Sequence, residues 1–379
     1  MKNCKELLAE SRVWVEETFR NIDNKMKEVT KRPRAEYNPR SWTAGFWGAT
    51  NVLLYEATKN EDYLKSAKVN EEKLDEALFD FEALYHDVGF MWHILSGALY
   101  RVTGDERSKN RNLLAAASLA SRFVLGGNYI RAWNDASAKG WPGRPVTNWT
   151  IIDCMMNLPI LYWASEHIGD DRFARIAMAH ADLSIRTHLR ADGSVIHCVE
   201  HDRETGDTLE TFGGQGIADG SSWSRGQAWA VYGFALSYLH TKETRYLDAA
   251  KQVANYFIAC CCDDWLPRID FRAPSEPVYY DTTAGCCAAC GLIEIAKALP
   301  EDEGGVYMHA AIKMLQAISE KFGDYNPETD GMILGGSVRY PVPGKYPVEK
   351  SGVHTHIIYA DFFFTEAILK LLGSEFNPW

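Results

Sequence analysis

The chain has 379 residues, of which 46% are hydrophobic and 24% are charged, an ordinary composition for a globular protein with a large core. Its formal net charge of −11 argues against a nucleic-acid partner or an anionic membrane surface, because both require clustered positive charge. The N-terminal pattern is that of an amphipathic helix, and no run reaches the roughly 18 apolar residues that span a bilayer. No linker rich in Pro, Gly or Ser interrupts the chain, so we expect residues 1–379 to form a single domain.

The nine cysteines indicate the compartment in which the protein works. Their number is odd, and several are adjacent, as at Cys260, Cys261 and Cys262. Disulfide frameworks rarely have this pattern, whereas reduced cytoplasmic proteins often do. A second group, at residues 286–290, begins an Ala-rich stretch, which favours buried structural thiols over a zinc site. We therefore predict a cytoplasmic protein without a metal ion.

Amphipathic and apolar helix patterns alternate along the chain. Six half-exposed helices, with charged residues at three-to-four spacing, are predicted at residues 5–22 and after residues 60, 104, 169, 242 and 301. Six apolar helices lie among them, at residues 44–58, 89–102, 153–168, 222–240, 283–299 and 357–372. A closed double ring with the apolar helices in its inner layer would bury all of them. We therefore predict an all-α fold, an (α/α)6 barrel, with an open superhelical solenoid as the alternative; residues 197–220 could add one β-hairpin.

Polar and aromatic side chains collect where the predicted inner helices begin. In a closed ring these helices run in the same direction, so their N-terminal ends meet at one rim, where free N–H groups favour an anionic ligand. The candidates at this rim are Trp42, His86, Asp87, Asp153, Gln215, Asp219, Ser221, Arg225, Trp229, Asp281, His354, His356 and Asp361. Asp87 and Asp153 matter most, because an ionisable group beside apolar sequence is costly unless it has a function. The repeat predicts that both carboxyl groups reach the same end of one cavity.

Structural roles compete with functional ones for several of these residues. An Asp before a helix is more often an N-cap than a catalytic group, which suits Asp281 well and Asp87 partly. A single Trp is more often part of the core. Arg225 must pair with something, and Trp229 follows four residues later on the same helical face. Together they could bind a carboxylate and a sugar ring.

Four longer motifs resemble those of one enzyme family. They are SWTAGFW at 41–47, HDVGF at 86–90, IIDCMMNLP at 151–159 and DGSSWSRGQAW at 219–229. In this order and at these spacings they are similar to the unsaturated glucuronyl hydrolases, glycoside hydrolase family 88. The similarity extends over most of the chain from about residue 38. The resemblance implies an (α/α)6 barrel, in agreement with the helix pattern.

The resemblance also implies a reaction. These enzymes act on oligosaccharides that polysaccharide lyases leave with a C4=C5 unsaturated uronic acid at the non-reducing end. They protonate C4, add water at the oxocarbenium-like C5, and release the neighbouring sugar when the hemiketal opens. By this resemblance Asp153 is the general acid and base, and Asp87 holds the ring and stabilises the developing positive charge. A group that both donates and accepts a proton needs a pKa near the working pH, so we expect burial and Asp87 to raise the pKa of Asp153.

Substrate contacts follow from the resemblance and from the rim. The resemblance assigns substrate contacts to His197, Gln215, Arg225 and Trp229 and aromatic walls to Trp42 and Trp133, while His86 and Ser221 are candidates from their place at the rim. Gln215 and Arg225 are placed around the uronate carboxylate. No metal or organic cofactor is implied, and we expect a monomer or a weak homo-oligomer.

The preferred substrate stays open in one respect. Gly214 falls where family members carry His or Arg, a position linked to preference for sulfated sugars. The hydroxyl-and-Lys pattern linked to sulfate in some relatives is incomplete near Lys350 and Ser351. We therefore expect a glycosaminoglycan-type disaccharide without specifying its sulfation.

Three alternatives remain at this point. An unsaturated rhamnogalacturonyl hydrolase would use the same barrel and chemistry on a different neighbouring sugar. A sugar 2-epimerase on the same barrel would need His acid/base pairs, for which only His354 and His356 are available, two residues whose spacing is also a weak metal-ligand pattern. A non-catalytic helical scaffold would have no use for Arg225 and two acids at one rim.

Overall fold

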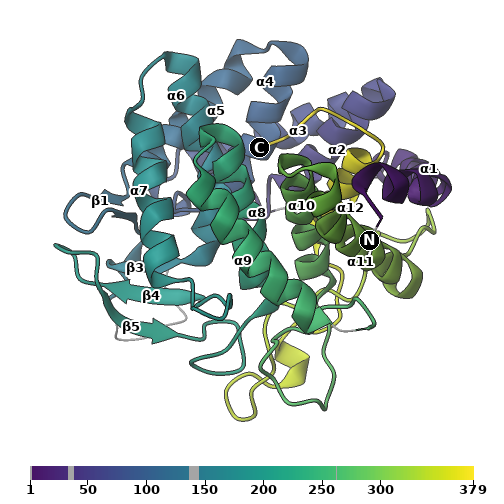
Figure 1. The fold of residues 1–379 in the computed structure, drawn as a ribbon. Helices are drawn as coiled ribbons and strands as arrows, with labels where there is room; N and C mark the ends of the chain where they lie inside the picture. Colours follow the sequence, from purple (N-terminus) through teal and green to yellow (C-terminus); the bar gives the residue numbers. More distant parts are fainter. Residues whose placement is uncertain (1, 33–37, 136–144, 262) are drawn as a thin grey trace.

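The computed structural model describes residues 2–32, 38–135, 145–261 and 263–379, in which outer and inner helices alternate. The outer helices of this described part are α1 (Cys4–Val29), α3 (Glu61–Leu78), α5 (Glu106–Ala120), α7 (Arg172–Thr187), α9 (Thr244–Cys261) and α11 (Glu301–Phe322) (Figure 1). The inner segments are α2 (Phe46–Thr58), the π-helix η2 (Gly89–Gly97) with α4 (Ala98–Thr103), the 3-10 helix η4 (Ile152–Asn157) with α6 (Pro159–Ile168), α8 (Ser224–Thr241), α10 (Thr282–Ala298) and α12 (Ile358–Leu371). Short 3-10 turns occupy Phe81–Ala83 (η1) and Val348–Lys350 (η5).

Burial explains the two layers. Every side chain of α8 from residue 224 to 237, and every side chain of α10 from 282 to 296, is buried. The outer helix α3 buries only one face, with Tyr63, Ala67 and Leu74 among the residues at three-to-four spacing. The apolar and amphipathic patterns in the sequence therefore predicted the two layers correctly.

The inner helices form a closed ring. Going round it, α2 contacts η2, η2 contacts η4 and α6, η4 contacts α8, α8 contacts α10, and α10 contacts α12. Contacts between α12 and α2 close the ring; nearby, the rings of Trp42 and Tyr359 lie 5.0 Å apart between centroids. This closure confirms the (α/α)6 barrel, and the open solenoid was the wrong alternative. No described helix is long and apolar enough to cross a bilayer.

Two small antiparallel sheets complete the described fold. One pairs β1 (Phe123–Val124) with β2 (Tyr129–Ile130), and the other has the order β3 (Trp149–Ile151), β4 (Cys198–His201), β5 (Thr208–Phe212). The β4–β5 pair is the hairpin predicted within residues 197–220. In the larger sheet Ile151 pairs with Cys198. This register brings the chain that enters η4 beside the chain that begins β4.

Pro159 determines where the third inner helix starts. It occupies the first position of α6, where the missing N–H and fixed φ of proline are tolerated. The preceding residues form η4 instead, with Asp153 in its first turn. As expected, Asp153 therefore lies just ahead of a regular helix, at the end of the ring where the inner helices begin.

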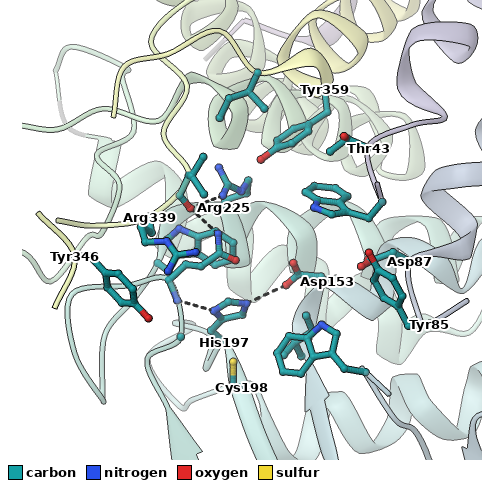
Figure 2. Close-up of a pocket in the computed structure, with 18 residues that line it drawn as sticks. Thr43, Tyr85, Asp87, Asp153, His197, Cys198, Arg225, Arg339, Tyr346 and Tyr359 are labelled. Carbon is teal, nitrogen blue, oxygen red and sulfur yellow. Dashed lines mark hydrogen bonds and ion pairs between the residues drawn. The ribbon is translucent and has the colours of Figure 1, made fainter. Parts of the chain in front are cut away.

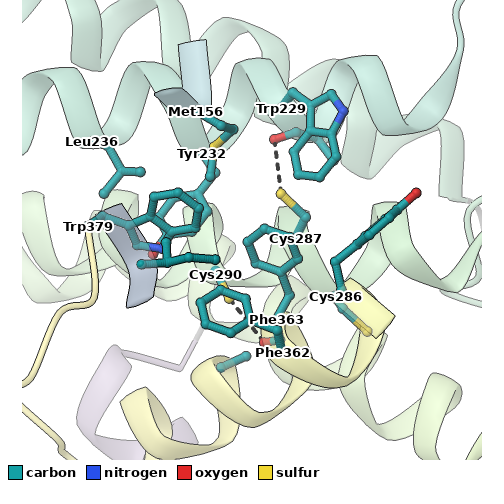
Figure 3. Packing of buried hydrophobic residues seen from close by; sticks show 14 of the residues in the cluster. Met156, Trp229, Tyr232, Leu236, Cys286, Cys287, Cys290, Phe362, Phe363 and Trp379 are labelled. Carbon is teal, nitrogen blue, oxygen red and sulfur yellow. Dashed lines mark hydrogen bonds between the residues drawn. The ribbon is translucent and has the colours of Figure 1, made fainter. Parts of the chain in front are cut away.

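The core extends along the axis of the ring and includes the C-terminal residue. Trp379 is buried and stacks on Phe363, with 6.0 Å between ring centroids (Figure 3). Arg101, in the last turn of α4, donates hydrogen bonds to the backbone carbonyls of Asn377, Pro378 and Trp379. The tail is therefore anchored between the inner helices, on the side where α4 ends.

Buried cysteines contribute to the same core. Cys286, Cys287 and Cys290 are fully buried in α10, next to the aromatic residues in Figure 3. This confirms the prediction of buried thiols for that group. Cys4, Cys154, Cys198, Cys286, Cys287 and Cys290 are free thiols; Cys262 lies outside the described residues.

Candidate active site

A pocket of about 490 Å³ opens where the inner helices begin. Its walls come from chain segments at the N-terminal ends of α2, η2, η4, α8 and α12, together with β-sheet and loop residues. They are Trp42, Thr43, Tyr85, Asp87, Trp133, Ile151, Asp153, His197, Cys198, Gly214, Gln215, Trp223, Arg225, Val338, Arg339, Tyr346, Ile357 and Tyr359 (Figure 2). Of the rim candidates inferred from the helix repeat, Trp42, Asp87, Asp153, Gln215 and Arg225 therefore share one cavity.

Both acidic residues line this pocket. The side chains of Asp87 and Asp153 are 10% and 14% exposed, so each carboxyl group is mostly shielded from water. Asp87 does not cap its helix with its side chain, although its backbone carbonyl accepts the Met91 amide. Its carboxylate has two long contacts, both at 3.4 Å, with the amide of Asn157 and with His86. The Asp87 carboxylate is therefore free to meet a ligand.

Asn157 connects the two acidic segments. Its Oδ1 accepts the Phe90 amide at 2.8 Å, and its Nδ2 donates to the Asp153 carbonyl at 3.3 Å. Gly89 allows Asn157 to come this close to the start of η2, because a Cβ at residue 89 would lie 2.7 Å from the Asn157 side chain. The sequence analysis did not identify this role, although Asn157 belongs to one of the quoted motifs.

His197 is the nearest polar neighbour of Asp153. Its Nε2 lies 3.4 Å from Oδ1 of Asp153, and its Nδ1 accepts the Gln215 amide at 3.1 Å. Because Nδ1 is an acceptor, the proton of the neutral ring resides on Nε2 and faces the carboxylate. The His197 ring is held against Trp223, with 4.3 Å between the ring centroids. In Figure 2 a dashed line joins His197 to Asp153.

The pKa of Asp153 departs from the sequence-based expectation. Burial raises the pKa of this carboxyl, but the contact with His197 and the charges of His86 and Arg225 together outweigh burial and lower it. The expected rise was wrong for the pocket without substrate. The sequence placed Asp87 near Asp153 but gave no sign that the N–H of His197 would point at the carboxylate.

Arg225 forms a buried ion pair with Asp281. Its Nη1 lies 2.9 Å from Asp281 and also donates to Thr283 and to the carbonyl of Ser337. Its Nη2 donates to the carbonyl of Val338 at 2.8 Å. Asp281 also caps α10 by accepting the Thr283 amide, which confirms the predicted N-cap. The pair therefore fixes the backbone of residues 337–338, and Arg225 still lines the pocket.

Residues 14–361 match the family described as Glycosyl Hydrolase Family 88. The chain belongs to this family. It is 36% identical over 343 residues to the unsaturated glucuronyl hydrolase of Bacillus sp. (strain GL1), covering 89% of this chain and 88% of that protein. It is 32% identical over 334 residues to the unsaturated chondroitin disaccharide hydrolase of Streptococcus pneumoniae (strain ATCC BAA-255 / R6), covering 87% and 81%.

Solved structures agree with this family membership. The unsaturated glucuronyl hydrolase of Bacillus sp. GL1, described as responsible for the degradation of glycosaminoglycan, superposes with a TM-score of 0.83 at 33% identity, covering 94% of this chain and 96% of that one. The unsaturated glucuronyl hydrolase of Streptococcus agalactiae gives a TM-score of 0.85 at 27% identity, covering 97% and 94%. The chain is thus a glycoside hydrolase of family 88 with that family's fold.

Not every predicted contact residue of this family 88 chain reaches the pocket. Trp42, Trp133, His197, Gln215 and Arg225 line it. The other three predicted contacts, His86, Ser221 and Trp229, are buried and are not among the residues that line it. Their contact with a sugar therefore stays a prediction, and the structure places them among the buried residues next to the pocket segments.

Each of these three residues has a structural place instead. His86 is fully buried and directs Nε2 toward Asp87. The carbonyl of Ser221 accepts a hydrogen bond from Arg190. Trp229 is fully buried one turn deeper in α8 than Arg225, with its ring against those of Phe90, Tyr359 and Phe363. Because α8 is buried all round, sharing a face with Arg225 did not bring Trp229 to the surface.

The remaining rim candidates have other partners. Nε2 of His354 accepts the Tyr280 amide at 2.8 Å, and Nε2 of His356 lies 2.8 Å from Asp361. Neither His354 nor His356 lines the pocket. A 2-epimerase would therefore have no pair of His side chains to act as acid and base there. Asp219 accepts the Gly213 amide at 2.9 Å. Within the described part of the chain, no group of three or more His, Cys, Asp or Glu side chains is placed to hold a metal ion.

Several pocket residues were missed by the sequence analysis. Tyr85 immediately precedes the His86–Asp87 motif, and that adjacency was the only available signal. Arg339 and Tyr346 lie in the irregular segment between α11 and α12, where no periodic pattern indicates which side chains face the cavity. Tyr359, in the first turn of α12, has the pattern of an ordinary core aromatic.

Proposed function

We propose that this family 88 enzyme hydrates the C4=C5 double bond of an unsaturated glucuronic acid at the non-reducing end of a lyase-generated oligosaccharide. The observation that carries the proposal is that Asp153, faced by the N–H of His197, shares one shielded pocket with Asp87. The named relatives act on unsaturated glucuronyl or chondroitin substrates. The products would be the hydrated uronate and the adjacent sugar.

Asp153 is proposed as the proton donor and acceptor. Its pKa is lowered in the empty pocket, so the carboxyl must gain a proton before it can act. Substrate binding would favour this, because expulsion of water and a uronate carboxylate nearby both raise the pKa of a carboxyl group. Asp153 would then give the proton to C4 and, as a carboxylate, take one from the water that adds to C5. The resulting hemiketal opens and releases the neighbouring sugar.

Asp87 is proposed as the charge stabiliser. Its carboxylate has no cation within ion-pair distance among the described residues, apart from the imidazole of His86 at 3.4 Å. An ionised group in a shielded pocket interacts strongly with positive charge that develops at C5 and the ring oxygen. The same carboxylate could hold a ring hydroxyl and orient the sugar.

The walls of the pocket suit a sugar ring between aromatic and polar groups. Trp42 and Trp133 are proposed as the aromatic walls, since both line the pocket and are only partly buried. Gln215 and Arg225 would contact the uronate side; both also hold the carbonyl of Val338. His86, Ser221 and Trp229 would support these groups from behind.

One assay tests this function. Loss of the ultraviolet absorbance of the conjugated double bond should accompany turnover of lyase-generated disaccharides. Asp153→Asn should abolish the loss, and Asp87→Asn should slow it at least about 100-fold. Asp105→Asn is the matched control, because Asp105 caps α5 away from the pocket and Asn is an equally good N-cap.

The choice of substrate can be read from the same assay. A glycosaminoglycan-type disaccharide is the proposed substrate, and an unsaturated rhamnogalacturonan-type disaccharide is the competing one. No absorbance change with chondroitin, hyaluronan, heparin or pectin-derived substrates would refute the proposal. In heavy water, deuterium should enter at C4; label at C2 would instead indicate an epimerase.

We also propose how the enzyme is organised. One catalytic domain is supported by a single large hydrophobic cluster that draws on all twelve α-helices of the described chain. A reducing, cytoplasmic location is supported by the buried free cysteines. A monomer or weak homo-oligomer without nucleic-acid or membrane partners remains the expected form, and light scattering of the purified enzyme would test its oligomeric state.

A further inference from the structure

The start of η2 does not use the cap that the local sequence offers. The Asp87 carbonyl accepts the Met91 amide at 3.2 Å, so Asp87 stands where an N-cap residue stands. The side chain of an Asp at this position ordinarily accepts the amide two or three residues later, which here belongs to Gly89 or Phe90. The Asp87 carboxylate lines the pocket instead (Figure 2), and Val88 makes no side-chain cap either.

Asn157 provides this cap from a distant segment. Its Oδ1 accepts the Phe90 amide at 2.8 Å, although the two residues are 67 positions apart in the chain. Asn157 is the last residue of η4 and is fully buried. A Cβ on Gly89 would lie 2.8 Å from the Cα of Asn157, so the glycine allows the two backbones to meet. The Phe90 amide is therefore occupied by an uncharged acceptor.

The other edge of the same carboxamide faces Asp87. Nδ2 of Asn157 lies 3.4 Å from Oδ1 of Asp87 and 3.3 Å from the Asp153 carbonyl. A primary amide has an acceptor on one side and donors on the other. Asn157 thus occupies the amide that Asp87 would otherwise bind, and presents a donor to the Asp87 carboxylate in the pocket.

We propose that Asn157 is a positioning residue that caps η2 in place of Asp87 and so keeps the Asp87 carboxylate in the pocket. The effect on catalysis rests on the proposed function, whereas the cap itself can be measured without substrate. In the absence of Asn157, the Asp87 side chain would turn to the unpaired Phe90 amide and leave the reacting sugar. The π-helical form of η2 agrees with a specialised role, because such segments are rare and frequently lie at functional sites.

Turnover tests whether Asp87 is withdrawn. Asn157→Ala should lower kcat about tenfold or more on the unsulfated unsaturated chondroitin disaccharide and change KM by less than about threefold, because the position of Asp87 matters most in the transition state. Asn112→Ala is the matched control. Asn112 is also fully buried and packs at the other end of η2, where a Cβ on Gly97 would lie 2.9 Å from its Nδ2. Equal losses of kcat in the two variants would refute the positioning role.

Thermal unfolding tests the cap. The loss of Tm caused by Asn157→Ala is measured in the wild-type and in the Asp87→Ala background. Asp87 can replace the missing cap only where it is present, so the loss should be larger by about 1 °C or more in the Asp87→Ala background. A loss that is equal in both backgrounds, or larger in the wild type, would refute the exchange of caps.

A second variant decides the matter if Asn157→Ala does not fold. Asn157→Asp keeps the size of the side chain and an oxygen for the Phe90 amide, but replaces the donor beside Asp87 with a carboxylate oxygen. It should lower kcat about tenfold or more, and an unchanged kcat would refute the positioning role. Failure of the wild-type enzyme to hydrate any unsaturated disaccharide would refute the proposed function, while the Tm comparison would still decide the cap.

Discussion

The N–H group of His197 can point only at Asp153. The Gln215 amide occupies Nδ1 of the ring at 3.1 Å, and Nε2 lies 3.4 Å from the Asp153 carboxylate. A donor held in this way stabilises the ionised carboxylate and opposes the effect of burial, which would keep the group protonated. Two opposing effects therefore act on the pKa of Asp153: burial raises it, and the contact with His197 lowers it.

Removing that donor should shift the pH profile upward. His197→Phe keeps an aromatic ring against Trp223 but removes the N–H, so burial is opposed only by the charges of His86 and Arg225 and the pKa of Asp153 rises above that in the wild type. The reaction needs protonated Asp153, and activity falls as pH rises through its pKa. The alkaline limb of kcat/KM should therefore move to higher pH by about one unit, measured with the unsulfated disaccharide. An alkaline limb that stays at the same pH, or moves to lower pH, would contradict this account. His309→Phe, on the outer helix α11, is the control and should leave the pH profile unchanged.

Gly214 should be required for activity rather than for folding. It has φ +61°, and a Cβ there would lie 2.1 Å from Nδ1 of His197. Gly214→Ala should therefore displace the ring and lower kcat/KM roughly 10- to 100-fold. Gly220 also has positive φ, at +77°, but a Cβ there meets nothing within 4 Å.

Gly220→Ala is accordingly the matched control for the backbone. Both substitutions incur strain of about 1 kcal/mol at positive φ, which thermal denaturation would measure. Only the change at position 214 should reduce turnover. Equal activity losses in the two variants would mean that strain, and not contact with His197, is responsible.

Breaking the buried ion pair should destabilise the protein strongly. Asp281→Asn keeps an oxygen that can cap α10 but leaves the Arg225 charge buried and uncompensated. The free energy of unfolding should fall by about 3 kcal/mol or more, measured by urea denaturation. Asp182→Asn, which breaks an ion pair with Arg245 at 2.7 Å between side chains that are 48% and 41% exposed, should change it by less than about 1 kcal/mol. Similar losses in both variants would refute the special role of burial.

The sequence predicted what depends on regular helices. Apolar runs such as residues 222–240 identified the inner ring, and Pro159 placed Asp153 ahead of α6. Asp281 was correctly interpreted as an N-cap because capping is a local interaction. Local patterns therefore sufficed for the barrel and for the rim that holds both acids.

What the sequence could not predict depends on contacts between distant segments. The low pKa of Asp153 arises from His197, 44 positions away in the chain. Arg339 and Tyr346 follow no period, so nothing local indicates that they face the cavity. Trp229 does not line the empty cavity for another reason: α8 is buried on all sides, so sharing a face with Arg225 does not bring a residue to the pocket.

The anchored tail has a consequence for how the enzyme meets a polymer. Trp379 packs between the inner helices and is held by Arg101, so the tail fills the ring on the side where α4 ends. If the enzyme has the proposed function, a saccharide would enter by its non-reducing end and leave by the same mouth. Such an arrangement would agree with an exo-acting enzyme.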